Sequence, residues 1–354
     1  MLMKNPKKRI IQKCPIPKSE HPYITMAHGS GGRMTHELID KIFIPAFGNA
    51  ESQFDHDGAV LKSPGDKLVV TTDSFVVNPL FFPGGDIGVL AVNGTVNDLA
   101  MCGARPLYLS ASFIIEEGLA IETLWQIVLS MRSAADIAGI KIVTGDTKVV
   151  DRGKGDGVFI NTTGIGEVMR DLRINPFNIK TGDFIIINGD IGRHGIAVLS
   201  QREGLSFDTV IKSDCAPLSD AVMRLIESGM EIHCLRDLTR GGLATALVEL
   251  ADTANVKVEI QEDLIPVLSD VNAACEILGF DPAYIANEGR FVAFVPERFV
   301  DKALAVMSSM GNEFLPAVIG KVIDTDAGLV TFKNSYGAEL IIDMLTGDQF
   351  PRIC

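Results

Sequence analysis

The chain has 354 residues, of which 47% are hydrophobic and 22% are charged, and its formal net charge is −13. That length suits about two domains with separate cores, and the composition excludes collagen, a disordered chain and a disulfide-rich miniprotein. No uncharged stretch is long enough for a membrane-spanning helix, and the N-terminus lacks the apolar core of a secretory signal. Because so acidic a chain repels phosphate backbones, nucleic acid is disfavoured as its main partner.

The first half of the chain is predicted to be a mixed α/β unit. Apolar residues at helical spacing predict helices at residues 34–43, 87–101 and 122–138. Gly139 is expected to end the third helix. Short runs rich in β-branched residues predict strands at residues 67–72, 107–115, 140–144 and 158–165.

A second unit of similar element types begins near residue 171. It contains predicted strands at 184–188 and 291–295 and predicted helices at 196–202, 216–228, 243–252 and 298–310. No internal repeat is strong enough to prove duplication. We therefore predict four parts: a flexible extension at 1–20, an N-terminal domain at 21–170, a C-terminal domain at 171–336 and a tail at 337–354.

Charge separates the first twenty residues from the rest. Residues 1–20 hold six Lys and Arg and a single acid, Glu20, so residues 21–354 carry a net charge of −18. This segment is interpreted as a solvated basic tail in preference to a docking arm.

A glycine cluster precedes the first predicted helix. Its residues are His28, Gly29, Ser30, Gly31 and Gly32. Successive glycines allow main-chain N–H groups to converge on an anion, and a helix N-terminus adds a favourable dipole. A flexible hinge explains the same residues equally well.

Aspartates recur at predicted strand ends and in turns of small residues. They are Asp55, Asp57, Asp73, Asp98 and Asp146. Carboxylates in such loops are the ligands that Mg²⁺ needs when it is shared with nucleotide phosphates. Any one of them alone is more commonly a helix or turn cap, but together they favour a magnesium–nucleotide site. The P-loop, GxGxxG and GxSxG motifs are absent from the sequence, so acids, metal and glycine turns would have to hold the nucleotide.

Four further residues are candidates for proton transfer or phosphate binding. Lys148 and Glu288 could be tuned toward neutral pH by burial or nearby charge, although a surface ion pair is the commoner role for either. His194 and Arg240 lie in predicted glycine turns and could meet phosphate, and His194 could equally be a turn residue with a satisfied hydrogen bond.

The six cysteines lie at positions 14, 102, 215, 234, 275 and 354, and no pair has CxxC spacing. Five are expected to be ordinary reduced thiols of a cytosolic protein. The sixth, Cys354, ends the chain, which excludes CaaX prenylation. A thiolate is a good covalent carrier, so Cys354 is interpreted as a carrier in preference to a chance thiol.

Several segments together resemble a known family. The segments at 84–106, 140–150, 236–251 and 284–290 and the terminal Pro-Arg-Ile-Cys are similar to the HypE hydrogenase maturation proteins, which are carbamoyl dehydratases of the AIR-synthetase (PurM-like) superfamily. The resemblance covers nearly the whole chain after residue 25. Relatives such as thiamine-phosphate kinase and selenophosphate synthetase share the acidic motifs but not the terminal cysteine.

The resemblance implies an architecture and an activity. The fold would be an α/β, PurM-like two-domain structure with a mobile C-terminal tail. The N-terminal sheets of a homodimer would join into a barrel, with ATP bound near the interface. A HypF-like carbamoyltransferase would load the terminal cysteine, ATP would drive dehydration to a thiocyanate, and a HypC/HypD-type scaffold would receive the cyanide for the [NiFe]-hydrogenase iron.

The resemblance also implies residue roles. Cys354 would accept the carbamoyl group, and Lys148 and Glu288 would handle protons. The residues implied for Mg²⁺ and ATP are Asp57, Asp73, Asp98 and Asp146, with residues 28–32 over the phosphates. His56 interrupts the family's usual paired-acid motif at Asp55.

Two other functions stay open at this point. One is a small-molecule kinase or ATP-dependent ligase of the same superfamily, which would not need the tail. The other is a non-enzymatic carrier that only presents Cys354 to partners.

Overall fold

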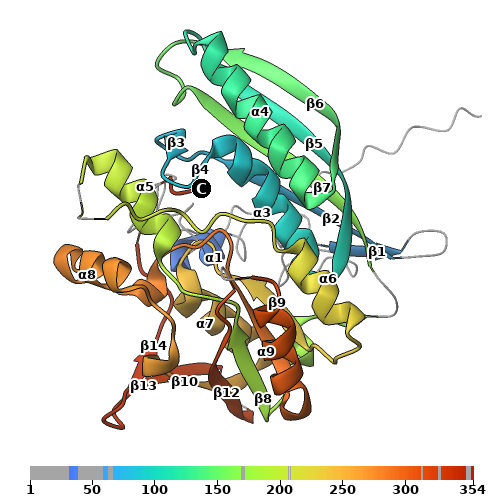
Figure 1. The fold of residues 1–354 in the computed structure, drawn as a ribbon, viewed down its shortest axis with the longest axis vertical. Coiled ribbons are helices and arrows are strands. Elements are labelled where there is room, and N and C mark those ends of the chain that lie inside the picture. Colours follow the sequence, from blue (N-terminus) through green and yellow to red (C-terminus); the bar gives the residue numbers. More distant parts are fainter. Residues whose placement is uncertain are drawn as a thin grey trace, which may run out of the picture.

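The computed structural model describes residues 32–38, 59–62, 67–168, 172–205, 207, 209–311, 314–325, 328–347 and 352–354. In these residues a five-stranded sheet forms the upper part of Figure 1 and a seven-stranded sheet the lower part. The structure is thus a mixed α/β fold with two sheets.

The five-stranded sheet comes from the first half of the chain. Its strands, in spatial order, are β1 (Ala59–Lys62), β2 (Lys67–Phe75), β7 (Val158–Val168), β5 (Ala104–Glu116) and β6 (Lys141–Val150). β5 and β6 are parallel, and the other neighbours are antiparallel. A small ribbon of β3 (Phe81–Phe82) and β4 (Gly85–Asp86) follows β2. The five-stranded sheet is open and not closed into a barrel.

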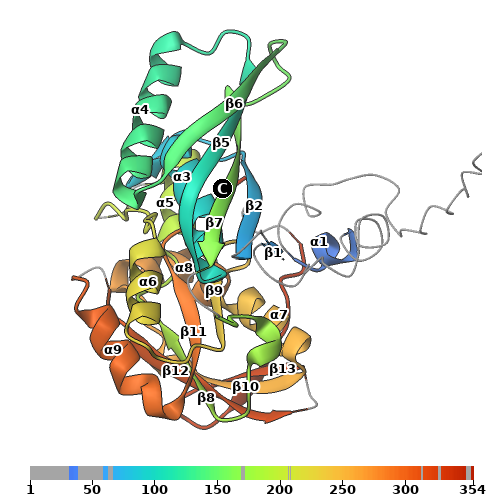
Figure 2. The same cartoon turned by 90° about the vertical axis from the view of Figure 1, so that its right-hand side faces the viewer.

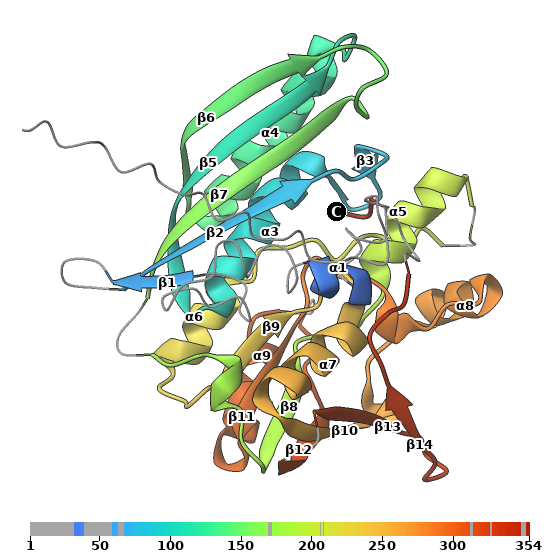
Figure 3. The same cartoon turned by 180° about the vertical axis from the view of Figure 1, so that it is seen from behind.

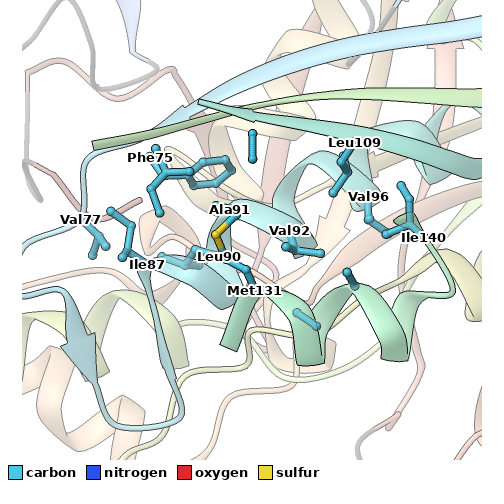
Figure 4. Close-up of a cluster of buried hydrophobic side chains, with 14 of the residues drawn as sticks. Phe75, Val77, Ile87, Leu90, Ala91, Val92, Val96, Leu109, Met131 and Ile140 are labelled. Atoms are coloured by element: carbon cyan, nitrogen blue, oxygen red, sulfur yellow. The ribbon is translucent and has the colours of Figure 1, made fainter. Parts of the chain in front are cut away.

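Two helices, α3 (Ile87–Met101) and α4 (Ile121–Ala138), lie on the same side of this sheet (Figure 2). Asp86 caps α3 by accepting hydrogen bonds from the N–H groups of Gly88 and Val89 at 2.7 and 3.1 Å. Gly139 ends α4 in the left-handed conformation at φ 68°. The core between sheet and helices includes Phe75, Leu90, Val96 and Met131 (Figure 4).

The seven-stranded sheet comes from the second half. Its strands, in spatial order, are β14 (Glu339–Ile342), β13 (Leu329–Lys333), β10 (Val256–Gln261), β12 (Ala317–Thr325), β8 (Asp183–Ile187), β11 (Phe291–Pro296) and β9 (Cys234–Asp237). The helices of this half are α5 (Arg193–Glu203), α6 (Ser219–Glu227), α7 (Gly242–Ala254), α8 (Ser269–Leu278) and α9 (Val300–Ser308). Short 3₁₀ turns lie at Pro176–Asn178, Glu262–Leu264, Pro282–Tyr284 and Glu297–Phe299, and the short helix α1 spans Arg33–Leu38.

Helix α3 is buried on nearly all sides because it packs against both halves of the chain. Val92 and Val96 join the core of the five-stranded sheet, whereas Ala100 and Met101 join a core with α6 and α9. Its Asn97 donates to the main-chain oxygens of Ala216 and Glu288 at 3.1 and 3.3 Å. This polar side chain therefore ties the two halves together.

The structure confirms most predicted elements and corrects several of their ends. The helix predicted at 87–101 has the bounds of α3, and α4 ends at Gly139 as expected. β6 runs on to Val150, well beyond the predicted end, because the paired strand β5 supplies ladder partners as far as Glu116. α5 begins at Arg193 and so includes His194, which was placed in a turn.

Within the predicted tail at 337–354, residues 339–342 form β14 and pair antiparallel with β13, a strand that was not predicted. The apolar run ELII completes the edge of the sheet. The prediction for 34–43 is confirmed as far as Leu38, and the remainder lies outside the described residues. Within the described part of the chain, the helices all fall short of the length and apolar character needed to cross a membrane.

Candidate active site

The end of the chain returns to the junction of the two halves. Figures 1 and 3 show the C-terminus beside β3 and α5. Ile353 is only 4% exposed and belongs to the core under the five-stranded sheet, and the half-buried Cys354 packs against the same core. The terminal cysteine is therefore held inside the molecule.

Asp73 lies within electrostatic reach of this cysteine, and Asp98 lies within reach of Arg240, which also acts on Cys354, but neither carboxylate has the setting that the sequence predicts. Asp73 is inside β2 and Asp98 is inside α3, so the expectation of carboxylates at strand ends and in loops is wrong for both. Asp146 likewise lies inside β6. The physical reason is that β2 and β6 continue past the residues where their β-branched runs end, because neighbouring strands supply ladder partners.

Hydrogen bonds fix the positions of both carboxylates. The Thr71 hydroxyl donates to Oδ2 of Asp98 at 2.8 Å, and the Ser74 N–H donates to Oδ1 of Asp73 at 2.7 Å. Burial raises the pKa of Asp73, and the positive charge of Arg240 opposes that shift. Arg240 is exposed to solvent, so its charge is screened more than that of a buried partner.

Glu288 is the most deeply buried carboxyl near Cys354, at 2% exposure. Burial raises its pKa well above the ordinary value, and the nearby charges of Asp237 and Asp73 raise it further. Its Oε2 atom is buried without a hydrogen-bond partner. A carboxyl in this state can accept a proton from a substrate when it is ionised.

A network of buried polar residues holds the loop that carries Glu288. Oδ2 of Asp214 accepts from the N–H groups of Glu288 and Gly289 at 3.2 and 3.0 Å. Arg290, 3% exposed, donates to both the main chain and the carboxylate of Asp190 at 2.8 Å. A side chain at Gly289 would overlap the main-chain oxygen of Asp214, so this close approach requires glycine.

The thiol of Cys354 is surrounded by the same groups. Burial raises its pKa above the ordinary range, and Glu288 adds to the effect while Arg240 opposes it. In this position the sulfur is a protonated thiol and a poor nucleophile at neutral pH. It must leave this environment to react as a thiolate.

Lys148 and Asp146 lie elsewhere. The Lys148 Nζ is 2.7 and 2.6 Å from the two carboxylate oxygens of Asp146, and both side chains are largely exposed. β7 and β5 separate β6 from β2, so three strand spacings put Asp146 about 14 Å from Asp73. Asp146 also lines a separate cavity of about 800 Å³ between α4 and β6. Lys148 and Glu288 of the same chain therefore do not lie in one site.

The remaining sequence candidates have mixed positions. His28, Gly29, Ser30, Gly31, Asp55 and Asp57 lie outside the described residues. Gly32 is buried before α1, where a side chain would overlap the main-chain oxygen of Leu345. His194 is fully buried and contacts the tail, with Nε2 2.8 Å from the main-chain oxygen of Ile353.

The chemistry of the donors fits magnesium that is shared with a phosphate. In the described ranges there is no group of three or more His, Cys, Asp or Glu side chains arranged to hold a metal. Mg²⁺ usually takes only one or two protein carboxylates and completes its shell with phosphate oxygens and water. Asp73 and Asp98 have the oxygen donors that such a pair of ligands would need.

Sequence reasoning missed Asn97, Asp214 and Arg290, which fix the loop of Glu288. Asn97 and Arg290 each stand in a mostly small or apolar run, and a polar residue there signals a buried hydrogen-bond role. Asp214 gave no comparable signal.

Comparison with known proteins agrees with this geometry. Residues 55–168 match the AIR synthase related protein N-terminal domain, and residues 180–333 match its C-terminal domain. Carbamoyl dehydratase HypE of Cupriavidus necator is 48% identical over 94% of this chain and 95% of its own length.

Solved structures give the same result. A HypE–HypF complex has a chain that is 47% identical with a TM-score of 0.82, and the match covers 87% of this chain and 99% of that one. HypE in complex with ATP is 45% identical with a TM-score of 0.79, covering 94% of this chain and all of that one. The two-domain, PurM-like fold is thus shown, and the chain belongs to the HypE carbamoyl dehydratases of the AIR synthase related family.

Proposed function

We propose that this chain uses ATP to dehydrate an S-carbamoyl group on its own Cys354 to an S-thiocyanate, which supplies the cyanide ligand of the [NiFe]-hydrogenase iron. The observation that carries the proposal is the position of Cys354 within the electrostatic reach of Glu288, Arg240 and Asp73. The relative from Cupriavidus necator is a carbamoyl dehydratase, which is the same type of reaction.

The chemistry requires activation of oxygen. Hydroxide is a poor leaving group, so the terminal phosphoryl group of ATP is transferred to the carbamoyl oxygen. Phosphate then leaves with that oxygen, both N–H protons are lost, and S–C≡N, ADP and phosphate remain. A relative of known structure holds ATP, and we extend ATP binding to this chain.

Glu288 is the proposed base for a nitrogen proton. Its raised pKa brings its basicity toward that of a general base acting near neutral pH, and its unpartnered Oε2 leaves an acceptor position for the N–H. General base assistance of this kind contributes about 10²- to 10⁴-fold. Arg240 would favour the negative charge that develops nearby.

Asp73 and Asp98 are the proposed ligands of Mg²⁺, and Asp57, with residues 28–32, completes the proposed nucleotide set. When bound, Mg²⁺ would neutralise charge on the transferred phosphoryl group. The role of the protein is to hold the two carboxylates at fixed positions through Thr71 and Ser74. The core that Ile353 enters would shield the S-carbamoyl group on Cys354 from bulk water.

The separation of Lys148 from Glu288 supports a homodimer in which a second copy completes the site. The sheet face opposite α3 and α4 exposes Tyr108 (46%), Ile114 (45%) and Ile165 (37%), which is unusual for a solvated face. Tyr108 and Ile165 are opposite each other in the ladder and so form one apolar patch. We propose that a second copy covers this patch and that the two sheets form a barrel.

The proposed partners follow from the reaction. A HypF-like carbamoyltransferase would load Cys354, in keeping with the HypE–HypF complex of a relative. A HypC/HypD-type iron scaffold would take the cyanide. The tail would be mobile between these states, and the need for a reduced thiol supports our proposal that the reaction takes place in the cytoplasm.

The function is tested by replacing the terminal cysteine. Cys354→Ala should abolish thiocyanate formation while nucleotide binding persists, and Cys275→Ala, which removes a buried thiol elsewhere, should retain activity. A superfamily kinase or ligase acting on a free substrate would be unaffected by Cys354→Ala. If the protein were a passive carrier, loss of Asp73 would not change its ability to present Cys354 to partners.

A further inference from the structure

The last residues of the chain lie antiparallel to the segment that follows β2. The Val76 N–H donates to the main-chain oxygen of Cys354 at 3.0 Å, and the Asn78 N–H donates to that of Arg352 at 3.3 Å. Both bonds run from the segment after β2 to the tail, and Arg352 between them has a left-handed backbone at φ 56°. The first half of the chain thus binds the tail through its main chain.

Helix α5 binds the tail from the other half. His194 in its first turn contacts the oxygen of Ile353 at 2.8 Å, and Arg202 in its last turn donates to the oxygen of Arg352 at 2.6 Å. Arg202 also donates to the oxygen of Asn78 at 2.7 Å. The main-chain oxygens of Arg352 and Ile353 and one main-chain oxygen of Cys354 therefore each have a donor.

The protonation state of His194 follows from its partners. A carbonyl oxygen only accepts, so Nε2 carries the hydrogen and Nδ1 accepts from the Ser213 hydroxyl at 2.8 Å. That hydroxyl in turn accepts from the Cys215 N–H at 3.0 Å. Burial lowers the pKa of His194 and so favours the neutral imidazole. A neutral ring has one donor nitrogen and one acceptor nitrogen, as these two hydrogen bonds require.

The side chains of the tail add selectivity. Ile353 fills a core position, and Arg352 forms an ion pair with Asp156. Within the described residues, the Sγ of Cys354 forms no hydrogen bond. The hydrogen bonds and the ion pair therefore engage the main chain and Arg352, Ile353 is held by core packing, and none of the hydrogen bonds uses the sulfur.

We propose that Val76, Asn78, Asp156, His194 and Arg202 form a tail cradle, a binding site that recognises the C-terminal Arg-Ile-Cys by its main chain, its arginine and its isoleucine. The cradle does not recognise the sulfur, so it holds the tail alike whether Cys354 is a thiol or carries a small substituent. The inference deepens the proposed function, because the tail that it binds is the one that would carry the substrate. His194 is a positioning residue in this cradle.

The cradle also determines when the sulfur can react. The docked thiol is protonated and half-buried, so its reaction with an external electrophile requires opening of the cradle. Weakening the cradle should therefore raise the reactivity of Cys354 in proportion to the open fraction.

The test is alkylation of the full-length protein with N-ethylmaleimide, without ATP or carbamoyl donor, followed by mass spectrometry of each cysteine peptide. His194→Phe keeps the ring, which packs edge-on to Phe82 at 5.4 Å, but removes the donor. It should speed modification of Cys354 roughly three- to tenfold. His194→Gln, which retains an N–H donor at the position of Nε2, should restore slow modification. His233→Phe is the matched control, because this second buried histidine bonds Asp183 and Glu231 instead.

The buried Cys102, Cys234 and Cys275 report on unfolding in the same sample. If they are alkylated together with Cys354 in His194→Phe, that variant has unfolded, and the milder Asp156→Asn is used in its place. Asp156→Asn must then raise the alkylation rate of Cys354 alone. An unchanged Cys354 rate in whichever of these two variants stays folded overturns the cradle. Neither result depends on dehydratase activity, so the proposed function is not at stake.

Hydrogen exchange tests whether the tail cradle binds the tail independently of the Cys354 sulfur. The Val76 and Asn78 amides should stay protected in Cys354→Ser and exchange faster in Arg352→Ala. Loss of protection in Cys354→Ser would mean that the cradle recognises the sulfur after all.

Discussion

Oδ2 of Asp214 accepts the main-chain N–H of Glu288 at 3.2 Å, so one buried carboxylate anchors the proposed base and also adds to the rise in its pKa that burial, Asp237 and Asp73 mainly cause. Anchoring and tuning are usually assigned to different residues. Here they coincide because the loop of Glu288 folds back over the segment that carries Asp214, with Gly289 allowing the close approach.

The dehydration rate should depend on the ionisation of Glu288. Because the pKa of Glu288 is raised, its carboxylate forms only at higher pH, and the rate should rise with pH through that pKa. Glu288→Gln should lower the rate about 10²- to 10⁴-fold and remove this rising limb. The exposed Glu262→Gln is the control. A Glu288→Gln variant that keeps the wild-type pH profile would exclude Glu288 as the base.

Asp214→Asn separates anchoring from tuning. The amide oxygen can still accept both main-chain N–H groups, but one of the negative charges that add to the burial-raised pKa of Glu288 is gone. The rising limb of the pH–rate profile should therefore move to lower pH, with the melting temperature as a check on folding. A limb that stays in place, or moves to higher pH, contradicts the electrostatic coupling.

Asp98→Asn tests the proposed metal ligands. Asparagine can still accept from the Thr71 hydroxyl, so the local structure should persist. Loss of the charge should raise the Mg²⁺ concentration needed for half-maximal nucleotide binding at least about tenfold. Asp343→Asn removes the charge of an exposed partner of Arg33 and can still accept from the Met344 N–H, so it should leave that concentration unchanged. If both variants need the same Mg²⁺ concentration for half-maximal nucleotide binding, Asp98 is not a magnesium ligand.

Mixing two inactive variants tests whether the site is shared between copies. Lys148→Ala and Glu288→Gln chains, dissociated and reassociated together, form mixed dimers with one intact composite site each. About half of the dimers are mixed, so roughly a quarter of wild-type activity should return. Each variant refolded alone is the control. If the mixture stays inactive, Lys148 does not act across the interface.

How much the sequence could predict depended on the range of the interactions. The helix at 87–101 was predictable from local apolar spacing, and the end of α4 was predictable from Gly139, which adopts the left-handed conformation there. Both features depend on residues that are close in the sequence. The full length of β6 was not, because it depends on pairing with β5. The strand at 339–342 was not predicted, because so short a run forms a strand only when β13 supplies its ladder partners.

The candidate site shows the same limit. Cys354 and Glu288 stood out by position and motif, and the family resemblance gave their roles. Their proximity depends on contacts between distant segments, such as His194 with Ile353 and Asn97 with the loop of Glu288, which no local pattern encodes. The distance between Asp73 and Asp146 could not be foreseen either, since it depends on the strand order. The roles of Asp57 and of residues 28–32 stay predictions.

The central claim is that Cys354 is carbamoylated and then dehydrated on this chain. Intact-protein mass spectrometry after incubation with a HypF-like carbamoyltransferase, carbamoyl phosphate and ATP tests it directly, with the modified residue located in the C-terminal peptide. The account predicts a gain of one carbamoyl group at Cys354, followed by an ATP-dependent loss of one water. A C-terminal peptide of unchanged mass while ATP is consumed, or a carbamoyl group that never loses water, would contradict it.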